Sequence, residues 1–98
     1  MTNFVESAKW ELIPDHMRGA VERYVMDGIP GGSFLTALLS GASLTEVVGR
    51  ADDDNQGALI GWAKFIYNEL PAACHGSPER VQAWIRHHGI NGLREFAQ

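Results

Sequence analysis

The chain has 98 residues, of which 45% are hydrophobic and 20% charged, and its formal net charge is −4. Such a chain is expected to form one domain over residues 1–98 that buries roughly 60–65% of its unfolded surface, and this composition excludes a disordered or membrane-spanning protein. The eight Lys and Arg residues are scattered, which disfavours binding to a DNA or RNA polymer but not to a small phosphate ligand.

The N-terminal segment, residues 2–12, is compatible with a short helix. Phe4, Ala8 and Leu12 share one face at a spacing of four residues, which places Trp10 off that face. A tryptophan in such a position suits an interface or a ligand stack, and the alternative is that it folds back onto the core. The sequence supports these two interpretations about equally.

Pro14 is expected to open the next helix, because proline is well tolerated in a first helical turn. The apolar residues of this helix recur at spacings of three and four: Met17, Ala20, Val21, Tyr24 and Val25. Gly28 suits the left-handed position that ends a helix. His16 stands beside the helix start, where it is either solvated or lines a site.

A Gly/Pro corner follows, written Gly28-Ile29-Pro30-Gly31-Gly32-Ser33. A helix that starts after such a corner has free backbone N–H groups, which can hold a phosphate or a carboxylate. The simpler interpretation is that the glycines only turn the chain and that Ser33 only caps the helix. Taken alone, the pattern favours the simpler interpretation.

The segment from Phe34 to Leu39 is apolar almost all round, so we expect it to be buried on more than one side. In so short a chain the simplest source of that cover is a second copy, which predicts an oligomer. Ser43 and Glu46 then have the spacing of a capping box at the start of another short helix.

The acidic run Asp52-Asp53-Asp54-Asn55 allows two interpretations. The order of residues does not fit a calcium-binding loop, which needs alternating oxygen ligands, a central glycine and a final glutamate. We therefore expect these residues to cap the long helix that follows, with a metal site as the minor alternative.

That long helix is predicted from an apolar stripe consisting of Leu59, Trp62, Ala63, Ile66, Tyr67 and Leu70. Pro71 ends it, and Ser77 with Pro78 begins a helix that presents Val81, Trp84, Ile85 and His88 on one side and ends at Gly89. Residues 90–98 are expected to add one turn through Leu93 and Phe96. Since every segment has the helical period and the connections are short, the domain is predicted to be all-α with antiparallel neighbouring helices.

Catalytic chemistry finds little support in the sequence. The candidates are Cys74 with His75 and the pair His87-His88, and adjacent residues in a turn seldom have the geometry for nucleophilic catalysis. The paired spacing of a zinc site is absent from these residues. We expect no enzyme, no cofactor and no metal, with Cys74 buried at a corner. The single cysteine and the lack of a signal or membrane-spanning pattern predict a soluble cytoplasmic protein.

An ordered set of residues in this chain is similar to a family of small tailed-phage proteins that includes the anti-CBASS cyclic-oligonucleotide sponges. The residues that carry the resemblance are Pro14, Met17, Tyr24-Val25, Gly28-Ile29-Pro30-Gly31, Ser33 to Leu39, Arg50-Ala51-Asp52, Asn55, Phe65 to Asn68, Pro71, Cys74, Gly76 to Glu79 and Trp84. The resemblance covers roughly residues 13–85.

The resemblance implies a helical protomer in a compact hexamer that sequesters cyclic di- and trinucleotides in the host cytoplasm without cleaving them, and so keeps a CBASS effector inactive. It also implies a ligand between protomers, with an aromatic and a long basic side chain around each base. The positions in this chain that it points to are Trp10 or His16 for the aromatic role, Gly31, Gly32, Ser33 and Thr36 near the phosphates, and Arg50, or Arg18, from a neighbouring protomer.

Two other functions fit the same sequence. The first is a phage inhibitor that binds a host defence protein directly, for which Asp52-Asp53-Asp54 would form part of the contact surface. The second is a structural or assembly protein of the virion.

Overall fold

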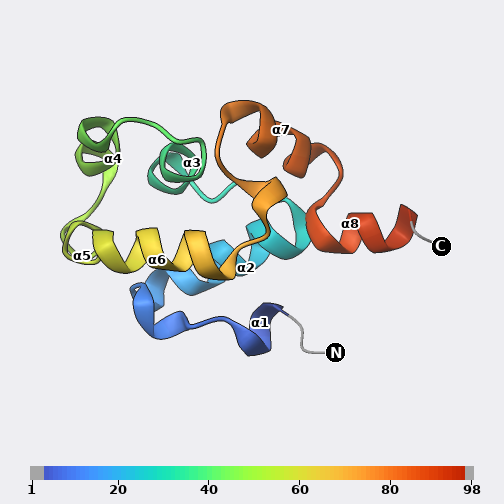
Figure 1. Cartoon of the computed structure of the whole chain (residues 1–98), viewed down its shortest axis with the longest axis horizontal. Helices are drawn as coiled ribbons and strands as arrows, with labels where there is room; N and C mark the ends of the chain where they lie inside the picture. The colour runs from blue at the N-terminus through green and yellow to red at the C-terminus, as the bar shows by residue number, and fades with distance from the viewer. Residues whose placement is uncertain (1–3, 97–98) are drawn as a thin grey trace.

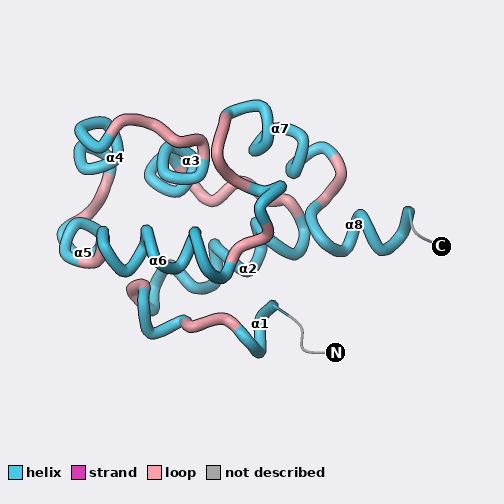
Figure 2. The backbone as a smooth tube through the Cα atoms, in the orientation of Figure 1, coloured by secondary structure: helices cyan, strands magenta, loops and turns pink. Residues whose placement is uncertain are grey.

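The computed structural model describes residues 4–96, and in that range the chain consists of helices joined by loops, without a β-strand (Figure 1, Figure 2). The α-helices are α1 (Phe4–Ser7), α2 (Arg18–Asp27), α3 (Ser33–Leu39), α4 (Leu44–Arg50), α5 (Asp53–Gly57), α6 (Leu59–Glu69), α7 (Pro78–Arg86) and α8 (Gly89–Phe96). Three turns of 3₁₀-helix lie between them: η1 (Trp10–Leu12), η2 (Asp15–Met17) and η3 (Ala72–Cys74). The predicted all-α class is confirmed.

Several helix boundaries follow the capping residues that the sequence offers. Gly28 adopts the left-handed conformation, with φ of 69°, and closes α2. The hydroxyls of Ser43 and Ser77 accept hydrogen bonds from the backbone N–H groups of Glu46 and Arg80 at the starts of α4 and α7. These three predicted boundaries are confirmed.

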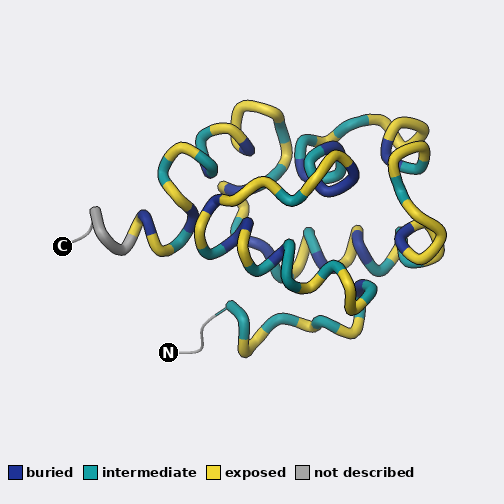
Figure 3. Tube along the Cα trace, turned by 180° about the vertical axis from the view of Figure 1, so that it is seen from behind, coloured by how far each residue is buried: buried dark blue, intermediate teal, exposed yellow. Residues whose placement is uncertain are grey.

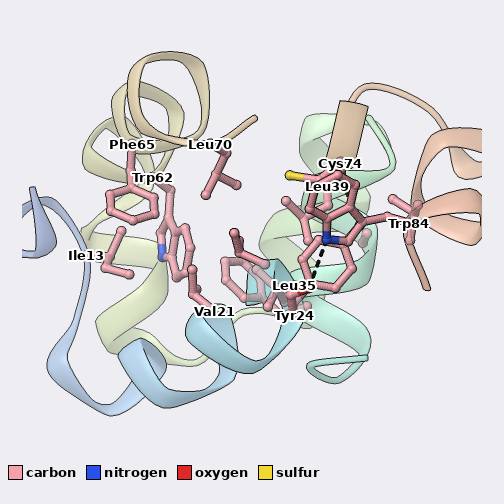
Figure 4. Packing of buried hydrophobic residues seen from close by; sticks show 14 of the residues in the cluster. Ile13, Val21, Tyr24, Leu35, Leu39, Trp62, Phe65, Leu70, Cys74 and Trp84 are labelled. Atoms are coloured by element: carbon pink, nitrogen blue, oxygen red, sulfur yellow. Dashed lines mark hydrogen bonds between the residues drawn. The ribbon is translucent and has the colours of Figure 1, made fainter. Parts of the chain in front are cut away.

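The core is built around two buried tryptophans, Trp62 on α6 and Trp84 on α7, which are 0% and 2% exposed (Figure 4). The Trp84 indole N–H donates to the carbonyl oxygen of Tyr24 at 2.9 Å, and the Tyr24 hydroxyl donates to the carbonyl oxygen of Cys74 at 2.7 Å. Both donors are buried, and the two bonds connect α2 with α7 and η3. A buried donor without such a partner would cost about 1–3 kcal/mol, so these bonds fix the mutual positions of the three segments.

The last helix, α8, packs against α2. Gly28 and Gly89 allow the close approach, because a Cβ atom at either position would lie within 3.0 Å of the other segment's backbone. The side chain of Asn91 also donates to Asp27 at 2.8 Å. The C-terminal segment is therefore a complete docked helix, longer than the single turn that the sequence predicted.

The short helix predicted within residues 2–12 is present as α1. It ends at Ser7, and residues 10–12 form the separate turn η1. This break rotates Trp10, whose ring lies 5.5 Å from Phe4 and 5.3 Å from Phe65. Trp10 is therefore half-buried and folds back onto the core.

The burial of α3 also differs from expectation. Phe34, Leu35, Ala37 and Leu39 are all buried within a single copy of the chain, where α4 and α7 pack against α3 (Figure 3). The chain itself supplies the cover that the sequence assigned to a second copy. The apolar character of α3 thus gives no reason to expect an oligomer.

The predicted long helix is split into α5 and α6, and the buried face of α6 differs from the predicted apolar stripe. The helical segment breaks at Ala58, between α5 and α6, so Asp52 caps the short α5 and not the long helix. On α6 the buried residues are Trp62 and Phe65, whereas Tyr67 is 85% exposed and Ala63 is exposed. Phe65 lies three residues after Trp62, so the two share a face that a stripe through Tyr67 misses.

His88 was expected on the apolar side of the helix after Pro78, and that prediction is wrong. The helix α7 ends at Arg86, and His88 is exposed in a backbone conformation with φ of 64°.

Within residues 4–96, no helix combines the length and the apolar character needed to cross a membrane.

Candidate functional site

The segment from Gly28 to Ser33, here called the glycine corner, joins α2 to α3. Gly32 occupies the N-cap position of α3 with φ of 99° and ψ of 174°, a backbone conformation that is nearly restricted to glycine. No side chain caps this helix, and Ser33 is its exposed first residue. The interpretation in which Ser33 is the cap is therefore wrong.

The glycine corner leaves the first turn of α3 without a capping side chain. Thr36 N–H donates to the carbonyl oxygen of Gly32 at 3.0 Å, which is the first backbone bond of the helix. The backbone N–H groups of the first-turn residues before Thr36 have no partner within the helix and no capping side chain. Gly31, Gly32, Ser33 and Thr36 thus form one continuous group, as adjacent residues of a helix start must.

Trp10 lies in a different environment. Its indole N–H donates to the carbonyl oxygen of Val5 at 2.9 Å, and the guanidinium of Arg18 lies 4.7 Å from its ring centroid. With Phe4 and Phe65 also against the ring, a nucleobase that stacks on Trp10 competes with groups of the same chain for the indole surface. The sequence pointed to Arg18 as a basic side chain from a neighbouring copy, and its contact with Trp10 within one chain was missed.

His16 and Arg50 are each engaged locally. The Nε2 atom of His16 lies 3.0 Å from a carboxylate oxygen of Asp52, which connects η2 with the start of α5. Arg50 donates to Glu46 one turn earlier on α4 at 3.1 Å. None of these contacts reaches the glycine corner, so the candidate residues form four separate groups within one chain: the corner, Trp10, His16 with Asp52, and Arg50 with Glu46.

The segment Asp52–Gln56, here called the acidic corner, is closed by its own side chains. Asp52 accepts from the N–H of Asn55 at 2.8 Å, and this bond is the main cause of the lowered pKa of Asp52, with His16 contributing. The buried Asn55 side chain accepts from the indole N–H of Trp62 at 3.1 Å. The Gln56 amide donates to the carbonyl oxygens of Val48 and Ala51 at the end of α4.

These bonds give the acidic corner a structural role. Each polar side chain named there closes a helix end or satisfies a buried donor, which agrees with the capping interpretation of the acidic run. The described part of the chain contains no group of three or more His, Cys, Asp or Glu side chains placed to hold a metal ion.

Cys74 is fully buried, as the sequence predicted, and burial raises the pKa of its thiol to about 12. A cysteine acts as a nucleophile through its thiolate, which is scarce at neutral pH for such a group. Burial also lowers the pKa of the neighbouring His75, with a smaller effect from Arg80. The pair has the properties of packed structural residues.

The surface formed by residues 4–96 has no pocket, and its most exposed large apolar side chains include Ile60 and Tyr67 on α6 and Leu44 on α4. Ile60 and Tyr67 are 74% and 85% exposed and lie seven residues apart on one helix, so they share a face. This face was missed because Tyr67 was assigned to the buried stripe.

Comparison of the chain with protein-family models, with curated proteins and with solved structures finds no match.

Proposed function

We propose that this chain is a phage-encoded, non-catalytic sponge that sequesters cyclic di- or trinucleotides and so blocks CBASS immunity in the host cytoplasm. The observation that carries the proposal is the uncapped first turn of α3 behind Gly32, with the exposed hydroxyl of Ser33 beside it. Backbone N–H groups at a helix start and a neighbouring hydroxyl suit a phosphate oxygen.

The affinity of such a site does not require a basic protein. Helix N–H groups, one or two arginines and an aromatic stack each contribute about 1–3 kcal/mol to the capture of a small phosphate ligand. The net charge of −4 is compatible with that mode of binding, because the donors are local.

The proposal places the ligand between copies of the chain, in an assembly that the family resemblance implies is a hexamer. A single copy has no pocket over residues 4–96, and its candidate residues lie in separate groups. A neighbouring copy would therefore bring Trp10, His16 or Arg50 to the glycine corner.

The primary test is binding of the purified full chain to a panel of cyclic di- and trinucleotides, measured by titration calorimetry, with the mass of the complex measured by light scattering. We expect micromolar or tighter binding by a multimer and recovery of intact nucleotide after the complex is denatured. A monomer that binds none of the panel contradicts the proposal, and recovery of cleaved nucleotide shows an enzyme.

A substitution at the glycine corner locates the site. Ser33→Asp puts a carboxylate beside the N–H groups that the phosphate needs, and acidic residues in a first helical turn favour the helix, so the fold is retained. We expect nucleotide affinity to fall at least roughly tenfold, which corresponds to 1.4 kcal/mol. Thr45→Asp is the matched control, because Thr45 is exposed in the first turn of α4. This substitution adds the same charge to the start of a different helix. Equal affinities of the two variants would remove the glycine corner from the site.

A second candidate function is direct inhibition of a host defence protein. The exposed face of α6 with Ile60 and Tyr67 favours it, since exposed aromatic and aliphatic side chains are typical anchors of protein interfaces. In a pull-down from infected cells, this function predicts a stoichiometric host partner that is lost in Tyr67→Ala and retained in Ser33→Asp. The sponge predicts capture of nucleotide with the opposite response to the two variants.

A further inference from the structure

Residues 4–12, here called the N-terminal arm, lie along one face of α6 (Figure 1). The carbonyl of Leu12 lies directly over Gly61, where a Cβ atom would overlap it. The ring of Trp10 lies 5.3 Å from that of Phe65, and the backbone N–H of Lys9 donates to Glu69 at 3.2 Å. Gly61, Phe65 and Glu69 are spaced by four residues, so they form one face of the helix, which is the seat of the arm.

The arm has the properties of a weakly held unit. It consists of one helical turn without a buried residue and one 3₁₀ turn, and segments this short are not stable as isolated helices. Its contacts with the core come from half-buried side chains, whereas Ile13, the residue directly after it, is 5% exposed. Units with few buried contacts open at a lower free energy than the core of the same protein.

The body of the protein is held by other interactions. Tyr24, Trp84 and Cys74 are connected by buried hydrogen bonds (Figure 4), and α8 docks on α2. These interactions involve no residue of the arm. Loss of the arm from its seat therefore leaves them intact.

We propose that the N-terminal arm is a strap that opens from α6 while the body stays folded, and that its opening separates the indole of Trp10 from Phe65 and Arg18 and uncovers one side of Phe65. The consequence for a ligand rests on the proposed function: a nucleobase that stacks on Trp10 binds the open form. The observed association constant of the nucleobase is then its intrinsic association constant multiplied by the fraction of molecules in which the arm is open.

The test compares two glycine-to-alanine variants of the full chain by hydrogen exchange. In Gly61→Ala the new methyl group overlaps the Leu12 carbonyl, while α6 itself gains helix propensity. In the control Gly57→Ala the new methyl group meets no atom within 4 Å. The arm amides to follow are those of Ala8, Lys9, Trp10 and Leu12, each of which donates a hydrogen bond in the closed form.

In Gly61→Ala we expect these amides to exchange roughly tenfold faster or more, a factor that corresponds to 1.4 kcal/mol. The body amides of Gly28 and Gly76, which donate to Tyr24 and Leu39, keep their protection. Gly57→Ala leaves both sets unchanged. The strap is refuted if arm and body lose protection together, if Gly61→Ala leaves the arm unaffected, or if the arm amides of the unmodified chain exchange only with global unfolding. These measurements use no nucleotide, so their outcome is independent of whether the chain binds one.

Discussion

The glycine corner and the acidic corner both lead into a helix, and they do so by opposite means. At the glycine corner the backbone conformation of Gly32 makes the turn, and no side chain caps α3. At the acidic corner Asp52 caps α5, and Asn55 satisfies the buried indole of Trp62. Helix donors are thus left open at the first corner and satisfied at the second.

This difference separates the residues that hold the fold from those available for binding. The acidic run has the stronger charge and would attract attention as a ligand site, yet the side chains of Asp52 and Asn55 are already hydrogen-bonded within the chain. The glycine corner carries no charged side chain and still presents the donors that an anion needs. Changes at the acidic corner should therefore affect stability, and side-chain changes at Ser33 should affect binding.

The largest expected effect is that of Asn55→Ala at the acidic corner. The substitution removes the acceptor of the buried Trp62 N–H, and a buried donor without a partner should lower the free energy of unfolding by about 2–3 kcal/mol. Urea denaturation followed by circular dichroism measures the change. Asn68→Ala, at an exposed position of α6, is the control and should change stability by less than about 0.5 kcal/mol.

A double-mutant cycle with Trp62→Phe tests the cause. If the hydrogen bond explains the loss, Asn55→Ala should cost clearly less in the Trp62→Phe background, because the donor is already gone. Equal costs in the two backgrounds would mean that Asn55 stabilises the acidic corner by packing alone.

Gly32→Ala should have the next largest effect. At φ of 99° an alanine is strained by about 1–2 kcal/mol, although a Cβ atom there meets no atom within 4 Å. Gly49→Ala is the control, since it is also free of contacts but lies within α4, where alanine favours the helix. A stability of Gly32→Ala equal to that of the unmodified chain would show that the glycine corner tolerates another conformation.

The sequence predicts the parts of this fold that depend on neighbouring residues. The αL position of Gly28, the caps at Ser43 and Ser77 and the burial of Cys74 are all confirmed, since each follows from local chemistry or from residue type. The same reasoning recognised the acidic run as a cap, and assigned it to the wrong helix because nothing in Gly57-Ala58 marks the break before α6.

Other errors concern contacts between segments that are distant in sequence. Trp10 meets Phe65 because the arm turns at residues 8–9, and periodicity within residues 2–12 contains no information about that partner. The cover of α3 comes from α4 and α7, whose distance from α3 in space is set by the whole chain. For the candidate site, the sequence indicated the open donors of the glycine corner, whereas the separation of Trp10, His16 and Arg50 from that corner required the fold.

Substitution of the helix-capping serines should have a smaller effect on stability, and it allows a direct comparison with Ser33, which does not cap its helix. Ser77→Ala and Ser43→Ala each remove a hydrogen bond to a first-turn N–H and should lower the free energy of unfolding by about 1 kcal/mol. Ser33→Ala removes no capping bond and should change it by less than about 0.5 kcal/mol. Thermal and urea unfolding of the three variants measure these differences. A cost at Ser33 as large as at Ser77 would show that its hydroxyl has a structural role after all.

The smallest expected effect is the pH dependence that Asp52 gives to stability. The hydrogen bond from Asn55 lowers the pKa of Asp52 in the folded chain, so the folded state favours the carboxylate. The resulting stabilisation is fully present above the pKa of the unfolded chain, near 3.9, and is lost as the pH falls through the lower folded value. Asp52→Asn keeps a capping oxygen but cannot ionise. Urea unfolding between pH 7 and pH 3 measures this difference, and the unmodified chain should lose more stability on acidification than Asp52→Asn does. Asp53→Asn is the control. It leaves the capping carboxylate in place and should follow the unmodified chain. Parallel losses in the unmodified chain and Asp52→Asn would mean that the charge of Asp52 contributes nothing to the acidic corner, and that its oxygen serves only as a neutral cap.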